Sequence, residues 1–562
     1  MTNILADMSQ CSPNNRLSKD YEDGHWQLTE YETADGVKGT MVSAAPEHDC
    51  GELTLALNAK GLHKIYLGIC FTKPQPDGWS QYGEFGVKLD GDYGYSRVGP
   101  ENMRVHAGHI PSKMGIRNEI YRSIQETYWK TADLTDKNLI LSQLWYPYNR
   151  AEHHPIANLS YVKLVPLAEE EIEQWKTDSP SKVTQNLGQM FCTGQITGHT
   201  SGTYNFHPTD EQWFRNELEP VIKSDFKLFI FEALRGSYAS YKTKIGYFGN
   251  KEDKWEEDWL DPVEIFTRLC HENGLKMFVS MRMIGPQHPM NRAPIARAKH
   301  YEEMPQFAKR DKLGRPTTGL SLAYPEVRQY WLSLLRETLE YGIDGIQLHL
   351  NRSNPFVMYE EPVVKAFQEK YGEDPRELPE SDPRYINLQA GYTTQFVREV
   401  NGLVNETPNR ELAVTFYGRP HKYDQERENF HPIRYGCDIE GWIREGLVDY
   451  LMPSPKIDTG LISKWRELVG DRVHIWPDLM PRTQPAEMYA ALAKKYYEAG
   501  ADGFCFWDGE RRTQRLSEWA AVRRLGHRDQ LDQIINHGSE FYRKINLETL
   551  GIFSARESYH DG

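Results

Sequence analysis

The chain has 562 residues, several times the length at which a single hydrophobic core stops growing, so two to four domains are expected. Lysine and arginine number 66 against 80 aspartate and glutamate, a net charge of −14 that argues against broad electrostatic capture of nucleic acid or anionic lipid. Apolar residues make up 39% and aromatic residues 12% of the chain, a composition that excludes a disordered protein.

The N-terminus and the cysteines predict where the protein resides. The first residues, MTNILADMSQCSPNNRLSKDYEDG, have neither the basic nor the apolar region of a signal peptide, and no run approaches eighteen consecutive apolar residues. We therefore expect no membrane partner and a cytoplasmic location, or a periplasmic one if a leader has been trimmed. The 7 cysteines are scattered and show no C-x-x-C spacing, which favours free thiols in a reducing compartment.

Residues 20–167 consist of short alternating segments separated by Gly, Pro and Asp, such as GELTLALN, HKIYLGICF and NLILSQLW. Short, evenly spaced strands with almost no helical period between them predict a β-sandwich. The closing run, YWKTADLTDKNLILSQ followed by ANLSYVKLVPL, resembles the jelly-roll modules attached to carbohydrate enzymes. The resemblance implies a carbohydrate-binding-module-like domain.

Residues 168–186 begin with the acidic stretch AEEEIEQWKTDSP and are expected to form a linker helix. From 187 to 526 apolar runs alternate with amphipathic stretches, the pattern of a parallel sheet covered by helices. Eight runs are candidate strands: GQMFCTG, KLFIFEA, KMFVSMR, GIQLHLN, LAVTFYG, VDYLMPS, VHIWPD and GFCFWDG. This count predicts a (β/α)8 TIM barrel as the catalytic domain, and the lack of a Gly-rich phosphate loop weakens the alternative of a doubly wound sheet. Residues 527–562 are expected to hold one helix and a polar tail.

In such a barrel the active site lies at the carboxyl ends of the strands and in the loops after them. Four carboxylates there are the catalytic candidates: Glu232, Asp478, Glu360 and Asp508. The candidates for binding substrate at the same end are Arg235, Arg282, His288, His349, Asn351, Arg352, Tyr417, Arg419, Trp476, Trp507 and Glu510. Asp344 and Asp502 precede their strands and belong to the opposite face, which carries stability.

These residue types point to carbohydrate chemistry. Carboxylates from several strands can meet across the barrel mouth, and glycoside hydrolysis needs one proton donor and one nucleophile or base. Glu232 and Asp478 are the preferred pair, with Glu360 and Asp508 in reserve and the acid left unassigned. The tryptophans offer flat faces to sugar rings, and arginine, asparagine and histidine supply hydrogen bonds to hydroxyl groups. The arginines also suit an anionic sugar, uronic or sulfated, because guanidinium binds both groups through paired hydrogen bonds.

Each carboxylate also has a purely structural interpretation. Glu232 follows the apolar run LFIF and is explained equally well as a paired structural carboxylate. Asp478 and Asp508 could cap the helices that follow them, and Glu360 could be a solvated loop residue.

The sequence lacks the motifs of metal-dependent and serine-based catalysis. His288 and His349 have no H-x-H or H-E-x-x-H spacing, so neither a metal nor a cofactor is expected. No G-x-S-x-G motif is present, which argues against serine-based acyl transfer.

The run GIDGIQLHLNRSNPFVMYEEPVVKAFQEKYGEDPRELPESDPRY, with AGADGFCFWDGERRTQRLSEW further on, resembles the glycosyl hydrolase-like 10 proteins. These are bacterial TIM-barrel proteins related to glycoside hydrolases, and the similarity covers about residues 190–525. The resemblance implies family-typical positions for Arg352, Glu360 and Asp508. Many relatives in the wider clan place an acid at the end of strand four, where this chain has His349 and Asn351. In a hydrolase, Glu360 or a group from strand two must then replace that acid.

The sequence thus predicts a glycoside hydrolase, a polysaccharide-degrading enzyme of carbohydrate metabolism, acting on an oligosaccharide or polysaccharide fragment. Two rival functions stay open. A non-catalytic carbohydrate-binding barrel is favoured by the missing acid on strand four. A lyase or isomerase would use His349 and Tyr417 as base and acid. Nucleic acid is not expected as a partner, and the oligomeric state is not assigned.

Overall fold

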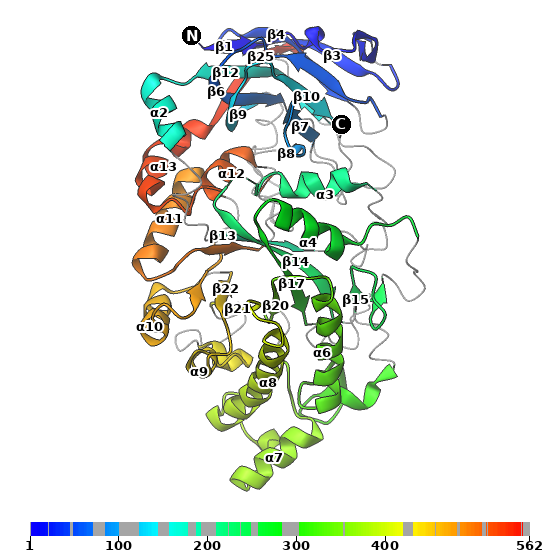
Figure 1. Ribbon diagram of the computed structural model, residues 1–562, viewed down its shortest axis with the longest axis vertical. Coiled ribbons are helices and arrows are strands. Elements are labelled where there is room, and N and C mark those ends of the chain that lie inside the picture. Colours follow the sequence, from blue (N-terminus) through cyan, green and yellow to red (C-terminus); the bar gives the residue numbers. More distant parts are fainter. Residues whose placement is uncertain are drawn as a thin grey trace.

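The structure is a computed structural model. It describes residues 2–20, 22–44, 49–70, 85–99, 123–143, 157–177, 187–192, 210–222, 224–236, 238–248, 257–283, 303–351, 355–419, 431–455, 457–479, 484–507, 513, 515–551 and 553–554. The β-rich N-terminal part lies at one end of the long axis and the barrel occupies the middle, with α7 at the far end (Figure 1).

Two sheets of mostly antiparallel strands build the N-terminal part. The larger sheet has the order β1 (Asn3–Leu5), β12 (Tyr161–Pro166), β6 (Leu62–Cys70), β9 (Ser123–Asp133), β25 (Tyr542–Leu550), β3 (Trp26–Thr33), β4 (Lys38–Ala44) and β11 (Ala157–Leu159), with β2 (Leu17–Ser18) beside β3 and β26 (Phe553–Ser554) beside β25. The smaller sheet has the order β5 (Leu53–Ala56), β10 (Asn138–Ser142), β7 (Phe85–Leu89) and β8 (Ser96–Val98). Leu53, Val87 and Leu139 from the smaller sheet share one buried cluster with Ile65 and Val162 from the larger. The expected β domain is therefore present, and its jelly-roll connectivity stays a prediction.

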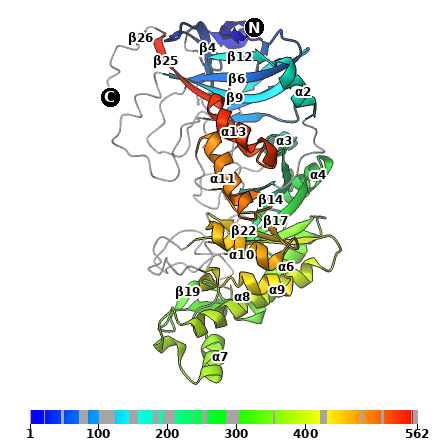
Figure 2. The same cartoon turned by 90° about the vertical axis from the view of Figure 1, so that its left-hand side faces the viewer.

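The C-terminal segment differs from the expected helix and polar tail. After α13 (Leu531–His537) the chain returns to the larger sheet as β25, which pairs with β9 on one side and β3 on the other. Figure 2 shows this strand crossing the sheet built by the first part of the chain. Ile545 and Leu547 are the buried residues of an otherwise polar strand, so the sequence pattern of KINLETL was too weak to predict it.

Eight parallel strands form a nearly closed barrel sheet, as predicted. They are β13 (Leu187–Cys192), β14 (Phe226–Arg235), β17 (Lys276–Arg282), β20 (Gly345–His349), β21 (Glu411–Tyr417), β22 (Tyr450–Ser454), β23 (His474–Ile475) and β24 (Phe504–Phe506). Consecutive strands pair from β13 to β23, and β24 pairs with β13. Between β23 and β24 the backbone N–H of Asp502 reaches the carbonyl of Ile475 at 3.1 Å, and that of Cys505 reaches Pro477 at 3.4 Å. These two bonds bring the last pair of strands together.

Helices surround the barrel sheet in the order the alternating pattern predicts. They are α3 (Glu211–Leu218), α4 (Pro262–Glu272), α6 (Pro325–Leu339), α7 (Glu361–Tyr371), α8 (Pro383–Val404), α9 (Ile439–Glu445), α10 (Thr459–Val469), α11 (Ala486–Glu498) and α12 (Leu516–Val522), with α2 (Glu169–Thr177) in the connection from the β domain. The helix α4 illustrates the local signals. Asp261 caps it by accepting the N–H of Val263 at 3.0 Å, Pro262 fills the first position, and Gly274 follows with φ +71°.

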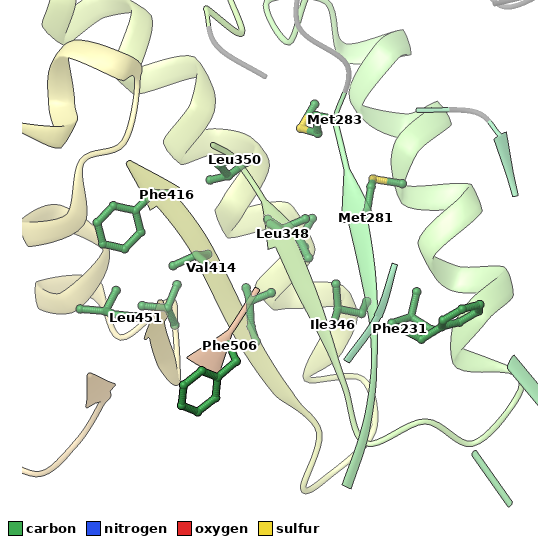
Figure 3. Packing of buried hydrophobic residues seen from close by; sticks show 14 of the residues in the cluster. Phe231, Met281, Met283, Ile346, Leu348, Leu350, Val414, Phe416, Leu451 and Phe506 are labelled. Atoms are coloured by element: carbon green, nitrogen blue, oxygen red, sulfur yellow. The ribbon is translucent and has the colours of Figure 1, made fainter. Parts of the chain in front are cut away.

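The barrel strands divide their side chains between two cores with a period of two. Residues such as Phe231, Met281, Leu348 and Val414 pack against the helices (Figure 3). The alternate residues form a separate cluster in the barrel interior: Leu228, Ile230, Phe278, Ala413, Tyr450, Met452, Trp476, Cys505 and Trp507. This alternation decides which residues at the strand ends face the mouth.

Within the described ranges, no helix has the length and hydropathy to cross a bilayer. The six cysteines whose side chains the structure describes are buried and free.

Candidate active site

A ring of side chains lies at the carboxyl end of the barrel, in phase with the interior cluster. Counting by two from Ile230, Phe278, Ala413, Met452 and Trp476 leads to the ring members on the same strands. The residues reached in this way are Glu232, Arg282, Tyr417, Ser454 and Asp478. His349 on β20 and Trp507 after β24 complete the ring. Strand register supports the ring, because the Cα atoms of Arg282 and His349 are partners, as are those of Tyr417 and Ser454. The barrel therefore brings together most of the predicted residues that the structure describes.

Glu232 is fully buried at the end of β14 among three basic side chains. Its Oε1 accepts hydrogen bonds from Arg235 Nε at 3.0 Å and from a terminal guanidinium nitrogen of the same residue at 2.7 Å. Its Oε2 lies 3.7 Å from the guanidinium of Arg282 and 3.4 Å from Nδ1 of His349. The four groups come from three adjacent strands.

A β-bulge explains how Arg235 joins this cluster. The register of β14 against β17 shifts between Phe231 and Leu234, so Arg235 pairs with Arg282 although it is an odd number of residues from Glu232. One extra residue reverses the alternation along a strand, and bulges of this kind re-aim side chains beside active sites. The sequence carried no signal for it.

The charges around Glu232 keep it ionised. Burial alone would raise the pKa of this carboxyl group, but the guanidinium groups of Arg235 and Arg282, together with His349, outweigh burial and hold the pKa far below the ordinary glutamate value. Among the described residues, two guanidinium groups face this carboxylate. Glu232 therefore cannot act as a proton donor near neutral pH.

His349 connects this cluster to the far side of the barrel. Its ring meets the indole of Trp507 edge to face, with the ring centroids 5.2 Å apart. His349 is fully buried, and 4% of Trp507 is exposed. Strand four and strand eight thus contact each other across the mouth.

Asp478 lies on the opposite side of the ring from Arg282. Its backbone N–H bonds to the carbonyl of Pro453, which fixes the loop after β23 beside β22. The Asp478 carboxylate accepts a hydrogen bond of 3.1 Å from the hydroxyl of Ser454, and both side chains are buried. The mouth thus has a basic side on strands two to four and an acidic residue on strand seven.

A layer of interior residues supports the ring from below. The amide of Gln347 donates to Thr415 Oγ1 at 2.8 Å and to the sulfur of Met452 at 3.3 Å. Trp476 belongs to this interior packing, with its ring 4.9 Å from that of Tyr450 and 1% of its surface exposed. The structure thus places Trp476 in the barrel core below Asp478, where it fills space.

Glu360 occupies a different environment from the ring. It is buried at the start of α7, and its carboxylate accepts the backbone N–H groups of Met358 at 2.8 Å and Arg310 at 3.0 Å. Burial raises its pKa, and these hydrogen bonds partly oppose that rise. Arg310 belongs to the hairpin of β18 (Ala308–Arg310) and β19 (Pro316–Leu320), so Glu360 joins the excursion after strand three to the loop after strand four. Its contacts are those of a structural carboxylate.

Lys309 reinforces the same junction. Its ammonium group donates to the carbonyl of Pro355 at 2.7 Å, and 1% of the residue is exposed. Burial lowers the pKa of Lys309 to about 7, against a smaller opposing effect of Glu360. This buried lysine was not among the sequence candidates, because nothing in the pattern AKR distinguishes it from a surface residue.

The remaining predicted residues fall in three places. Asn351 is buried after β20, where its N–H bonds to the carbonyl of Thr415 at 3.2 Å. Tyr417 is half-buried with its ring 5.2 Å from that of Tyr435, and Arg419 is exposed two residues further on. Four predicted residues lie outside the described residues: His288, Arg352, Asp508 and Glu510.

Two further placements concern residues that sequence reasoning excluded or missed. Asp344 accepts the N–H of Met277 at 2.8 Å and Asp502 that of Ile475 at 2.9 Å, both at the amino ends of strands as expected. Ser454, the hydroxyl partner of Asp478, was missed, although its position as the last residue of VDYLMPS was the available signal.

Among the described residues, no three His, Cys, Asp or Glu side chains gather closely enough to hold a metal ion. The chemistry available to the ring is that of carboxylate, imidazole, guanidinium and hydroxyl groups.

No family model and no curated protein matches the chain. Among solved structures, trehalose-6-phosphate hydrolase from Bacillus licheniformis is 13% identical over 59% of this chain with a TM-score of 0.31, and this chain covers 65% of its length. An alpha-galactosidase from Thermus thermophilus is 12% identical over 87% of this chain and 94% of its own, with a TM-score of 0.28. A GH31 family sulfoquinovosidase from E. rectale is 11% identical over 89% of this chain and 70% of its own, with a TM-score of 0.31. Similarity at this level does not bear on the substrate or mechanism of this chain.

Proposed function

We propose that the protein is a glycoside hydrolase that acts on an oligosaccharide or polysaccharide fragment bearing an acidic group. The observation that carries the proposal is the ring at the barrel mouth. Asp478 and Arg282 both lie at inward-facing strand positions there, on opposite sides of the barrel. Glycosidic bond cleavage needs carboxylates at such a mouth, and a basic wall suits an anionic sugar.

The electrostatics divide the roles between the carboxylates. Glu232 stays ionised and is bound by two arginines, so we assign it as a positioning residue that holds Arg235, Arg282 and His349 in place. Asp478 is the reacting carboxylate in this proposal. Asp508, the residue after Trp507 in the sequence, is the proposed second carboxylate. The backbone bond from Cys505 to Pro477 supports this pairing, because it holds the two strand ends side by side.

Arg282 supports the choice of an acidic sugar. Within the described part of the chain, its guanidinium makes one ion pair, at 3.7 Å to Glu232, and donates no hydrogen bond; its side chain is 19% exposed. Guanidinium groups bind carboxylate and sulfate through two parallel hydrogen bonds. A uronic or sulfated sugar would supply the hydrogen-bond acceptors that Arg282 has not engaged.

The proposal is tested by measuring release of reducing ends from neutral, uronic and sulfated oligosaccharides. Asp478→Asn should lower turnover by roughly 10²–10⁴-fold, the usual contribution of a catalytic acid or base. Asp471→Asn is the matched control, because Asp471 is a fully exposed aspartate shortly before β23. This change should leave turnover unchanged. Arg282→Met should reduce turnover of acidic substrates selectively. Cleavage of no oligosaccharide in the panel, or full activity of Asp478→Asn, would refute the assignment.

One observation favours a second candidate function. The contact between Glu232 and Nδ1 of His349 orients the imidazole, as carboxylates do for histidine bases. A lyase acting on uronic sugars would use His349 as the base and Tyr417 as the acid. It would form an unsaturated product that absorbs in the ultraviolet, which hydrolysis does not form.

A further inference from the structure

A cavity lies between the β domain and the barrel helices. It has a volume of about 1280 Å³ and is bordered by strands β6 and β9 on one side and by α2, α12 and α13 on the other. Figures 1 and 2 place α2 and α13 directly beside the larger sheet. We call this cavity the interdomain groove.

The interdomain groove is separate from the barrel mouth. Glu219, Pro220 and Ile222 line it and immediately precede β14, so they lie at the amino end of that strand, while Glu232 is near its carboxyl end. Arg523 also lines the groove, and its carbonyl accepts the N–H of Asp225 just before β14. A ligand confined to the groove would therefore not contact the ring.

Aromatic side chains form part of the groove wall. The rings of Tyr128 and Phe541 stack with centroids 5.0 Å apart, and Tyr66 meets Tyr128 edge to face at 5.5 Å. Trp175 on α2 is 48% exposed, one of the few large apolar side chains so exposed in the described residues. Aromatic surface of this kind, with a few polar groups around it, is typical of a ligand site.

Among the described residues, the lysine and arginine side chains that line the groove have acidic partners, except for Arg523. Lys64 bonds to Glu171 at 2.6 Å, and Lys130 bonds to Asp92. Among the described residues, the guanidinium of Arg523 has no hydrogen-bond or ion-pair partner, and its Nε is buried. Burying a guanidinium nitrogen without a partner is costly, so an anionic group in the groove would supply the missing acceptor.

We propose that the interdomain groove binds an acidic oligosaccharide segment, with Arg523 pairing its carboxylate or sulfate and the aromatic wall packing against its rings. The choice of ligand rests on the proposed function, because one polymer could then occupy the mouth and the groove. The groove would hold a long substrate while the ring acts on another part of the same substrate or of a neighbouring chain. Shorter substrates would reach the mouth without using the groove.

Binding is measured by calorimetry with three probes: a galacturonic acid hexasaccharide, a sulfated hexasaccharide and neutral maltohexaose. The host is the full chain carrying Asp478→Asn, so that the probe is not consumed. Arg523→Gln and Trp175→Ala should each weaken binding of an acidic hexasaccharide at one site by roughly ten-fold. Arg444→Gln, at an exposed arginine on α9, is the matched control and should bind as the host does. Because Trp175 is exposed, its replacement tests the groove even if Arg523→Gln folds poorly.

Hydrogen exchange locates the bound probe. An acidic hexasaccharide should slow exchange in β9 and α12, and this protection should be lost in Arg523→Gln. Unchanged affinity in both groove variants, or no protection of β9 and α12, would overturn the groove site. Neither result affects the reducing-end assay of the wild-type protein, which decides the proposed function separately.

Discussion

Replacing Glu232 by glutamine removes a negative charge from a buried site that contains two arginines. Loss of one partner from a buried ion pair costs about 3–5 kcal/mol, because the remaining charge is left without compensation. The side chains of Arg235 and Arg282 are 11% and 19% exposed and can be partly hydrated. The lower end of the range therefore applies, about 3 kcal/mol. At roughly 2 °C per kcal/mol for a large domain, the melting temperature should fall by about 6 °C.

Equilibrium unfolding in urea, followed by tryptophan fluorescence, measures this change. Glu445→Gln removes an exposed partner of Arg398 and is the matched control, with an expected loss below about 1 kcal/mol. The pKa of Glu232 is depressed in the folded protein, so its stabilisation is complete above the ordinary glutamate pKa of 4.5 and is lost as the pH falls through the folded pKa. The difference between wild type and Glu232→Gln should therefore be constant from pH 6 to 8 and shrink in acid. Equal stability of the two proteins at pH 7 would show that the arginines do not depend on Glu232.

Two further predictions concern buried groups away from the ring. Lys309 has a pKa of about 7 in the folded protein, against 10.5 for an ordinary lysine, so the unfolded chain binds more protons between these pH values. The stability of wild type relative to Lys309→Met should therefore rise from pH 7 to 9, by up to about 1.4 kcal/mol per pH unit. Urea titrations at both pH values check this, and a difference that does not vary with pH would contradict the buried position of the ammonium group. Ile545→Asp places a charge in the buried side of β25 and should cost roughly 3 kcal/mol or more, whereas Asn546→Asp at the exposed neighbouring position should change thermal stability little. Equal melting temperatures for the two variants would argue against β25 as a central strand of the larger sheet.

The alternation of apolar runs and amphipathic helices was sufficient to predict the barrel. Leu228 and Ile230 alternate with Phe229 and Phe231, and burial on both faces of such strands leaves the same near-continuous apolar signal in the sequence. The strand β25 escaped prediction because β9 and β3, which flank it in the sheet, lie more than 400 residues away in the chain, and local pattern contains no information about such pairings.

The candidate site was predictable in position and less so in chemistry. Strand ends are visible in sequence, and Glu232, Arg282, His349 and Asp478 were all selected on that basis. Their ionisation depends on which charges surround each of them, and this was not visible. Glu232 was expected to be one of the reacting pair, and its contacts with arginine are the reason that we propose it as a positioning residue instead.

The sequence by itself determined the eight-stranded parallel sheet and the end at which polar side chains gather, because periodicity and strand boundaries are local properties of the chain. Only the tertiary structure decided that Arg235 turns toward Glu232 through a bulge, that His349 meets Trp507 across the mouth, and that Glu360 binds backbone N–H groups in a loop junction. These outcomes depend on register between strands and on the electrostatic field of residues distant in sequence. Such interactions exist only after the barrel has closed.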